Sequence, residues 1–214
     1  MAAVQSASEV DVGQDTAEVH RARYRLHRDA GRWQEALRHH EALLVCREAE
    51  LARLEALAIR DGLTGLFSRR QFDARLTEEC QRAKRYGRPL SLLLLDVDRF
   101  KDINDRLGHI VGDRVLQTVA GIIQENTRTV DLPARYGGDE VAVLLPDTDR
   151  SGAREAAEKL RSLIAATDWS DIVDGLSVTI SVGVAGYVDG GVLLEAADRA
   201  LYVAKRAGRD QISG

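Results

Sequence analysis

Two kinds of hydrophobic pattern alternate along the chain: helical spacing and short, continuous apolar runs. Residues 18–60 contain no proline and a single glycine, and their pattern predicts helix. The run PLSLLLLDVD at 89–98 has the length of a strand and predicts a central strand buried on both faces. The stretches VAVLL at 141–145 and LSVTISVGVAGY at 176–187 predict two more strands. Further helices are predicted from Ser68 to about Tyr86 and over residues 110–125, 151–166 and 191–207.

Turn and capping residues mark the ends of the predicted helices and strands. Ser68 followed by Gln71 is a capping-box signature for the helix that the segment GRP at 87–89 ends. Gly137 and Gly138 predict the tip of a two-residue hairpin with positive φ, which leads into the strand at 141–145. The resulting order of strands and helices predicts an α+β fold, an α/β sandwich in which helices pack on a mixed sheet.

The first part of the chain has a different character from the rest. Residues 1–17 are small, polar and acidic, and we predict a disordered tail. The segment GRWQEALRHHEALL at 31–44 resembles half of a tetratricopeptide repeat. Because only about one repeat is present, an amphipathic helical hairpin is the alternative. The sequence therefore predicts a helical segment over 18–60 and a globular domain over 61–214.

A patchy heptad runs through the helical segment. Leucines 37, 44 and 51 and Ala58 recur every seven residues, and Leu54 fills one of the d positions. His40, Arg47 and Asp61 stand at the other d positions. The pattern is compatible with a short, weak coiled coil that pairs two copies of the chain.

Composition narrows the functional classes. The 214 residues suffice for one domain plus an appendage, and 44% hydrophobic with 30% charged residues is ordinary for a soluble globular protein. The net charge of −4 gives no sign of a nucleic-acid surface. The two cysteines form no disulfide framework, the N-terminal residues contain no apolar core of a signal peptide, and no apolar run approaches the length of a membrane span. We therefore expect a cytoplasmic protein.

Two acids mark the ends of predicted strands. Asp96 closes the central strand, and Asp139 lies at the hairpin. If the hairpin pairs with the central strand, the two carboxylates meet at one edge, where they repel each other unless a cation binds. Oxygen ligands without histidine or cysteine favour Mg²⁺ or Mn²⁺, and such an ion indicates phosphate chemistry. The alternative is that these acids only cap and solvate strand ends.

Four stretches in register carry a family resemblance. They are DGLTGLFSRR at 61–70, DVDRFKDINDRLGHIVGD at 96–113, RYGGDE at 135–140 and LYVAKRAGRD at 201–210. Together they resemble the GGDEF domain family, the diguanylate cyclases, over about residues 61–212. The resemblance implies a sheet like the palm of nucleotidyl cyclases and polymerases. It also implies condensation of two GTP into cyclic di-GMP with release of two pyrophosphates.

The resemblance also implies a catalytic centre. The family's metal ligands fall on Asp96, the backbone carbonyl of Val97, and Asp139. Asp139 also takes the family's role in activating the attacking 3′-hydroxyl, and Glu140 positions metal or substrate. The implied ion is Mg²⁺ or Mn²⁺.

The implied substrate site divides into a guanine part and a phosphate part. Asn104 and Asp113 fall at the positions that recognise guanine, which suits an amide and a carboxylate. The main-chain N–H groups around residues 99–101 (Arg99, Phe100 and Lys101) would hold the terminal phosphates. Lys205 and Arg209, four apart and expected on one helical face, would reach the same phosphates.

The segment RTVD at 128–131 lies at the family's spacing for a product-inhibition site, so the resemblance implies that Arg128 and Asp131 bind cyclic di-GMP. Arg135 is expected to lie near them and add charge. The alternative is a surface Arg–Asp pair, which contributes little energy. Two positions depart from the family pattern: Val141 stands where the family has Phe, and Ser68 where it usually has Asn.

These observations favour an active, metal-dependent diguanylate cyclase that works as a homodimer. A catalytically silent protein that binds GTP or cyclic di-GMP is the main alternative, with Val141 as a sign of decay. A third hypothesis makes the N-terminal helices a docking module for a protein partner. No nucleic-acid partner and no membrane span are expected.

Overall fold

The computed structural model describes residues 17–57 and 59–214. Its internal contacts divide the chain into two units, residues 1–58 and 59–214. The predicted tail falls outside the described residues up to position 16, as do Ala58 and the side chain of Leu54 from the heptad. No helix within the described ranges combines the length and the apolar character needed to cross a membrane.

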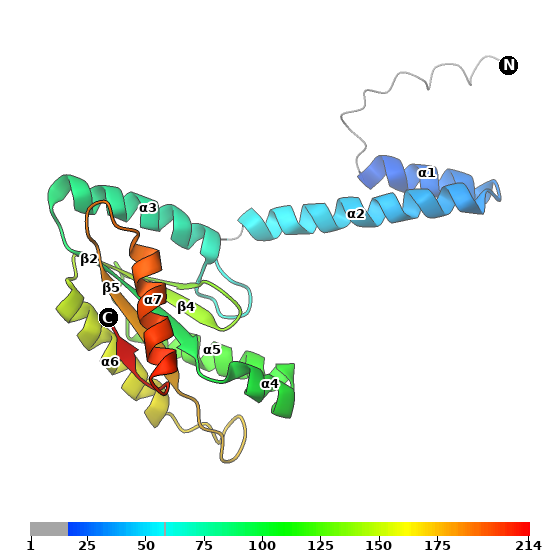
Figure 1. Cartoon of the computed structure of the whole chain (residues 1–214). Coiled ribbons are helices and arrows are strands. Elements are labelled where there is room, and N and C mark those ends of the chain that lie inside the picture. Colours follow the sequence, from blue (N-terminus) through cyan, green and yellow to red (C-terminus); the bar gives the residue numbers. More distant parts are fainter. Residues whose placement is uncertain (1–16, 58) are drawn as a thin grey trace. The chain divides into compact units, whose positions relative to one another are not determined.

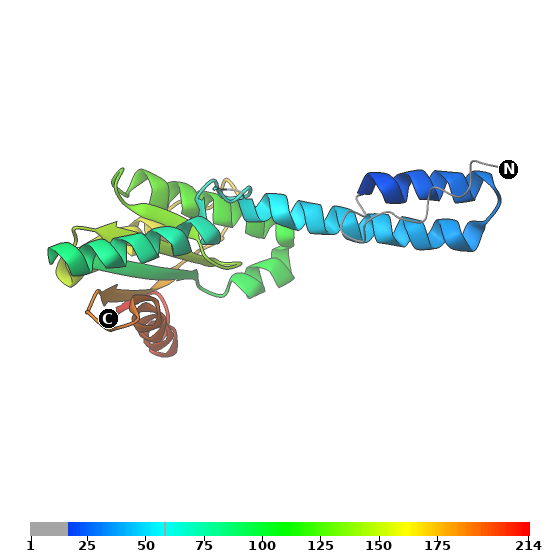
Figure 2. The ribbon, with the colours of Figure 1, turned by 90° about the horizontal axis from the view of Figure 1, so that it is seen from above.

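The first unit is a helical hairpin. Helices α1 (Ala17–Asp29) and α2 (Trp33–Leu57) lie side by side and are joined by a short turn (Figures 1 and 2). Ala36 and Leu43 of α2 are buried. A helical hairpin is expected under both N-terminal hypotheses, so the resemblance to a tetratricopeptide repeat stays a prediction.

The second unit is built on a six-stranded mixed sheet in the order β1-β3-β4-β2-β5-β6. The central strand β2 pairs antiparallel with both β4 and β5, whereas β1 and β6 pair in parallel with β3 and β5 at the edges. The predicted mixed sheet and the buried central strand are confirmed, since every residue of β2 is buried. The strands are β1 (Phe67–Ser68), β2 (Leu90–Val97), β3 (Leu132–Arg135), β4 (Glu140–Pro146), β5 (Ile180–Gly186) and β6 (Ile212–Ser213).

Five helices flank this sheet (Figure 1). Alternate residues of β2 point to opposite faces, so Leu93 and Leu95 pack in one core with α5 and α6, while Leu92 and Leu94 pack in another with α3 and α7. This double burial explains why the β2 sequence is a continuous apolar run. The helices are α3 (Arg69–Tyr86), α4 (Phe100–Leu107), α5 (His109–Glu125), α6 (Arg150–Ala166) and α7 (Leu193–Arg206).

Two local predictions need correction. Helix α4 was not predicted, although Phe100, Ile103 and Leu107 recur at helical spacing along a largely charged segment. The strand predicted over 176–187 begins only at Ile180, because its partner β2 ends at Val97, directly opposite. The capping prediction for α3 is confirmed: Ser68 is the N-cap, and its Oγ accepts from the N–H of Gln71 at 3.4 Å.

Candidate active site

Strand pairing brings the acids of the two sequence motifs together at one end of the central strand. Asp96 of β2 lies opposite Glu140 of β4, and the N–H of Val97 donates to the carbonyl of Asp139 at 3.3 Å. The condition set by the sequence, that the hairpin pairs with the central strand, is therefore met. The pairing places the carboxylate-bearing residues 96, 139 and 140 at the same edge.

Lys205 of α7 reaches the same point. Its Nζ lies 2.6 Å from Asp96 Oδ2, and the Asp96 side chain is only 12% exposed. Lys205 was expected to contact phosphates, whereas here its ammonium neutralises a predicted metal ligand. The last turn of α7 thus places a cation directly against the carboxylate cluster.

The pKa of Asp96 reflects its burial and its charged neighbours. Burial raises the pKa of Asp96 to about 6; the ion pair with Lys205 opposes this rise, and the charges of Asp139 and Glu140 add to it. One lysine does not fully compensate the cluster. A site of this kind favours binding of a further cation.

The donor set fits a hard divalent ion. Within residues 17–57 and 59–214, no three His, Cys, Asp or Glu side chains are grouped so that they could hold a metal by themselves. The set implied by the family needs only two carboxylates and the Val97 carbonyl, all oxygen donors. Mg²⁺ typically keeps such a partial set of protein ligands and completes its coordination with water and substrate phosphates.

The two glycines of the hairpin serve a purpose other than the predicted one. Four residues, 136–139, separate β3 from β4, and neither Gly137 nor Gly138 has a positive φ. The predicted two-residue turn with positive φ is therefore wrong. A Cβ on Gly137 would lie 2.8 Å from Glu140 Oε2, whereas a Cβ on Gly138 would meet nothing within 4 Å. Gly137 makes room for the Glu140 side chain, and Gly138 lies beside open space.

The expected phosphate site lies at the start of α4. Arg99 precedes this helix in a left-handed conformation, with φ of 54°, and no side chain caps the helix. The N–H groups of Phe100 and Lys101 in the first turn have no intrahelical acceptor. Such groups at a helix N-terminus bind anions.

Arg209 is not on the helical face on which it was expected. Helix α7 ends at Arg206, and Arg209 lies in the following turn with φ of 67°. Its N–H donates to the carbonyl of Ala204 at 3.2 Å. Arg209 and Arg99 line the same groove, of about 560 Å³, so the turn brings Arg209 beside the start of α4.

The residues expected to recognise guanine lie where α4 meets α5. Asn104 belongs to α4, and its Oδ1 is buried without a hydrogen-bond partner. A Cβ on Gly112 of α5 would overlap that oxygen, so glycine lets the amide lie against α5 next to Asp113. A buried, unpaired acceptor is unfavourable. The donor-rich edge of a purine would satisfy it.

Arg128 and Asp131 form a tight pair away from this centre. Arg128 Nη2 lies 2.7 Å from Asp131 Oδ1, and the Arg128 N–H donates to Asp131 Oδ2 at 2.8 Å. Asp131 is buried, and the pair raises the pKa of Arg128, mainly through the hydrogen bond with Asp131. Arg135 does not join them: it binds Asp61 at 3.2 Å and the Gly138 carbonyl, at the other end of β3.

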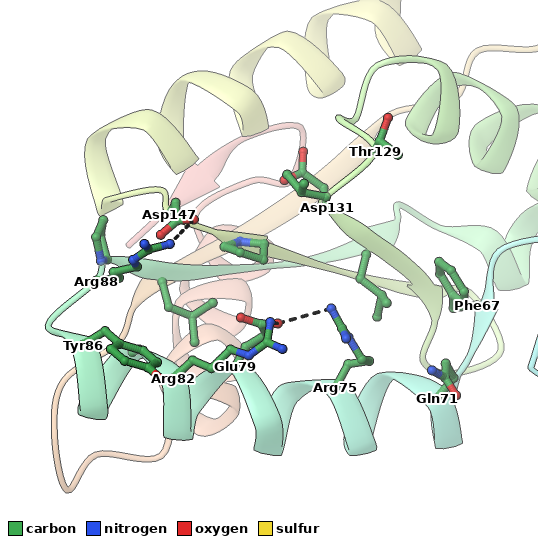
Figure 3. Close-up of a pocket in the computed structure, with 16 residues that line it drawn as sticks. Phe67, Gln71, Arg75, Glu79, Arg82, Tyr86, Arg88, Thr129, Asp131 and Asp147 are labelled. Atoms are coloured by element: carbon green, nitrogen blue, oxygen red, sulfur yellow. Dashed lines mark hydrogen bonds and ion pairs between the residues drawn. The ribbon is translucent and has the colours of Figure 1, made fainter.

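Asp131 opens onto a groove of about 840 Å³ (Figure 3). Arg75 and Arg82 of α3, together with Arg88, also line it. Glu79 accepts from both Arg75 and Arg82, and Arg88 pairs with Asp147 at 3.5 Å. The groove thus combines several guanidinium groups with buried carboxylates.

One buried acid of this region, Asp98, received no role in the sequence analysis. Its carboxylate accepts from Thr179, Ser181 and the N–H of Asp210. The only sequence signal was its place two residues after Asp96.

At the position that departs from the family pattern, Val141 is 4% exposed and packs in the core that contains α5 and α6.

Comparison with known proteins shows what the chain is similar to. Residues 58–211 match a family model described as "Diguanylate cyclase, GGDEF domain". The chain is 44% identical over 158 residues to diguanylate cyclase DgcP of Pseudomonas aeruginosa, a match that covers 72% of this chain and 24% of DgcP. The chain therefore spans about a quarter of that relative's length.

Two solved structures are similar to the chain. One is the GGDEF domain of DgcB from Caulobacter crescentus in complex with c-di-GMP, with a TM-score of 0.69 and 35% identity over 73% of this chain and 95% of that one. The other is diguanylate cyclase SiaD of Pseudomonas aeruginosa in complex with its activator SiaC. Its TM-score is 0.67 and its identity 36%, over 90% of this chain and 75% of that one.

Proposed function

Since this chain belongs to the diguanylate cyclase GGDEF domain family, we propose that it condenses two GTP molecules into cyclic di-GMP and releases two pyrophosphates. The observation that carries the proposal is the convergence of Asp96, Asp139 and Glu140 at one end of the central strand. Such a cluster is unfavourable for an inert strand end and suits a phosphoryl-transfer site.

The residues of this chain divide the work of binding GTP. Asn104 and Asp113 hold the guanine edge, with Asp113 accepting from the ring N1–H and the exocyclic amine. The N–H groups of Phe100 and Lys101 and the guanidinium of Arg209 hold the terminal phosphates. Lys205, already within reach of Asp96, adds positive charge on the same side.

The chemical step transfers a nucleotidyl group. The 3′-hydroxyl of one GTP attacks the α-phosphate of the other, an O–P bond forms, and the bond to the β-phosphate breaks, so that pyrophosphate leaves with the electron pair. The same attack in the opposite direction closes the ring and releases the second pyrophosphate. Asp139 takes the hydroxyl proton, and Glu140 holds the turn and the substrate in place. Asp96, the Val97 carbonyl and Asp139 would hold a Mg²⁺ or Mn²⁺ ion, which would supply Lewis acidity toward the hydroxyl and the phosphate.

Each domain binds one GTP, so two domains must face each other, and we propose a homodimer. Helix α2 supports this proposal, because Leu37, Leu44 and Leu51 recur every seven residues and are 57%, 47% and 59% exposed. A second copy of α2 would cover these leucines. Pairing there would raise the effective concentration of one domain near the other.

The helical hairpin also suits a protein partner. SiaD, which aligns with 90% of this chain, was solved with an activator protein. Trp33 and Val45 of α2 are 66% and 64% exposed, so they offer apolar surface beyond the heptad. We propose that a partner protein acts on the cyclase through this hairpin.

Product binding at Arg128 and Asp131 supplies feedback in this proposal. The planar guanidinium of Arg128 suits a phosphate or a guanine edge, and the neighbouring groove presents further arginines (Figure 3). Cyclic di-GMP carries two phosphates and two guanines, which match that combination of charges. The related DgcB domain was solved with the same molecule.

Mass spectrometry of the product tests the activity. Incubation with GTP and Mg²⁺ should yield cyclic di-GMP and pyrophosphate, whereas a silent binder would return GTP unchanged. Asp113→Ala should weaken GTP binding and relax discrimination against ATP. An unchanged preference for GTP would remove Asp113 from the guanine site.

A further inference from the structure

Asp98 is a buried carboxylate that the proposed chemistry does not use. Its Oδ1 accepts from Ser181 Oγ at 2.6 Å, and its Oδ2 accepts from Thr179 Oγ1 at 2.7 Å and from the N–H of Asp210 at 2.9 Å. The residue is 7% exposed. Asp98 thus joins the end of β2 to β5 and to the turn that follows α7.

Backbone strain gathers around this carboxylate. Among the described residues, four non-glycine residues have a positive φ, and three of them are Arg99, Arg209 and Asp210, with φ of 54°, 67° and 45°. Arg99 follows Asp98 directly, and Asp210 donates its N–H to Asp98. Left-handed conformations are unfavourable for residues with a Cβ and persist only where the surroundings enforce them.

The turn at 208–210 is held from two sides. On the inner side, Asp98 accepts from the Asp210 N–H; on the outer side, Arg161 Nη1 lies 2.7 Å from Asp210 Oδ1. The Arg209 N–H also donates to the Ala204 carbonyl. These contacts fix the backbone on both sides of Arg209, whose side chain is exposed and lines the groove that Arg99 and Asp102 share.

We propose that Asp98 is a positioning residue for nucleotide binding, which locks the turn at 208–210 so that Arg209 faces the start of α4. The inference rests on the proposed function, because it takes the start of α4 as the phosphate site. Without the carboxylate, the Asp210 N–H loses its acceptor and the turn relaxes toward ordinary φ values. Arg209 then points away from the phosphates, although nothing that touches them has been removed.

A double-mutant cycle tests this dependence. The affinity for 3′-deoxy-GTP, which lacks the attacking hydroxyl, is measured by calorimetry with Mg²⁺ for the wild type, Asp98→Ala, Arg209→Ala and the double variant. We expect each single variant to bind about tenfold more weakly and the double variant to bind no more weakly than Arg209→Ala. If the loss of affinity in the double variant equals the product of the two single losses, the inference is overturned, because Asp98 would then act independently of Arg209. Wild-type affinity in Asp98→Ala would overturn it as well.

Further variants separate positioning from general stability. Ser91→Ala removes another buried hydrogen bond of β2, from Ser91 Oγ to the Thr148 carbonyl, and should leave nucleotide affinity unchanged. Asp98→Asn keeps an acceptor for the Asp210 N–H and should restore most of the affinity. If Asp98→Ala does not fold, Arg161→Gln serves instead, because it removes the ion pair that holds Asp210 from the outer side. Arg161→Gln should weaken nucleotide binding about threefold in a protein that has Arg209, and should have no effect in Arg209→Ala. An equal loss without Arg209 would contradict the proposal.

The same titration distinguishes a failure of the proposed function from a failure of the role proposed for Asp98. A wild-type protein that binds no 3′-deoxy-GTP would overturn both the proposed function and the role of Asp98. A wild-type protein that binds the nucleotide, with independent effects of Asp98 and Arg209, would overturn only the role of Asp98.

Discussion

At the scale of single residues, the carboxylates of the candidate site have opposite structural circumstances. Asp98 accepts hydrogen bonds from three uncharged donors, whereas Asp96 pairs with Lys205 and lies near two further acids. A carboxylate whose oxygens all accept hydrogen bonds stabilises the structure, whereas a carboxylate close to other acids is a candidate for catalysis. We therefore propose different functions for two acids that are only two residues apart.

The role of Asp139 predicts a large loss of rate. Asp139→Asn removes the charge that takes the proton of the 3′-hydroxyl and one oxygen ligand of the ion. We expect kcat to fall by about 10²–10³, as for the loss of one preorganised electrostatic group. Initial rates of cyclic di-GMP formation measure this effect, with Asp198→Asn, an exposed acid of α7, as the control. A folded Asp139→Asn with nearly wild-type kcat would exclude the role.

The raised pKa of Asp96 predicts a pH-dependent stability. The folded state favours the protonated form, so the contribution of Asp96 to stability is fully present below its unfolded pKa of about 4 and is lost as the pH rises through about 6. Asp96→Asn cannot ionise and avoids this loss. Allowing for solvent screening, we expect a gain of about 1 kcal/mol, or about 2–4 °C in Tm, on going from pH 4 to pH 7.5.

Calorimetric melting in EDTA measures that difference between Asp96→Asn and the wild type. Asp102→Asn, at an exposed position of α4, is the control and should show no such change between the two pH values. If the wild type instead gained stability over Asp96→Asn as the pH rose, the ion pair with Lys205 would outweigh the burial of Asp96.

At the scale of elements, helix α2 has two apolar faces with different neighbours. Ala36 and Leu43 are buried within the hairpin, whereas Leu37 and Leu44 are exposed. Neighbouring residues of a helix point in different directions, so each buried side chain is followed directly by an exposed one. The exposed row is what a second copy of the helix would cover.

Disrupting the exposed row should weaken assembly. In the variant Leu37→Asp with Leu44→Asp, the buried carboxylates would oppose pairing of two α2 helices. We expect the dimer to dissociate about tenfold more readily in sedimentation, and specific activity to fall more at low protein concentration than at high. Arg38→Gln with Ala49→Asp changes the net charge by the same amount at two exposed positions on another face of the helix and should have no effect. Activity per molecule that is independent of dilution in both proteins would show that α2 is not the dimeriser.

At the scale of the whole molecule, the candidate catalytic centre and the candidate product site lie at opposite ends of the sheet. Asp131 precedes the first residue of β3, whereas the turn with Asp139 follows its last. The short strand β3 therefore links the two regions covalently. Product bound at Arg128 would not occupy the GTP site, so inhibition should be noncompetitive with GTP.

Arg128→Ala should relieve this inhibition and leave initial rates similar. Loss of a charged, bidentate contact corresponds to about tenfold weaker product binding. Initial rates at several GTP concentrations with added cyclic di-GMP measure the effect. The control is Arg199→Ala, which removes an exposed arginine of α7 that pairs with Glu195. Equal inhibition of wild type and Arg128→Ala would show that the pair is only a surface contact.

The sequence alone determined the features that depend on neighbours along the chain. Burial on both faces of β2 required a continuous apolar run, and Ser68 capped α3 through local hydrogen bonding. The four motifs in register identified the family. Strand burial and helix capping can be predicted from the sequence because hydrophobic periodicity and capping depend on only a few neighbouring residues.

Only the tertiary structure decided the contacts between distant segments. Lys205 meets Asp96, and Asp98 meets Asp210, across more than a hundred residues of sequence. The turn of Arg209 and the role of Gly137 likewise depend on which atoms already occupy the neighbouring space. Periodicity predicts which face of an element is buried, but the partner of each charged group depends on how the elements pack. For that reason the sequence indicated the acids of the site, and the fold determined that Lys205 pairs with Asp96 while hydrogen bonds from β5 and the turn after α7 hold Asp98.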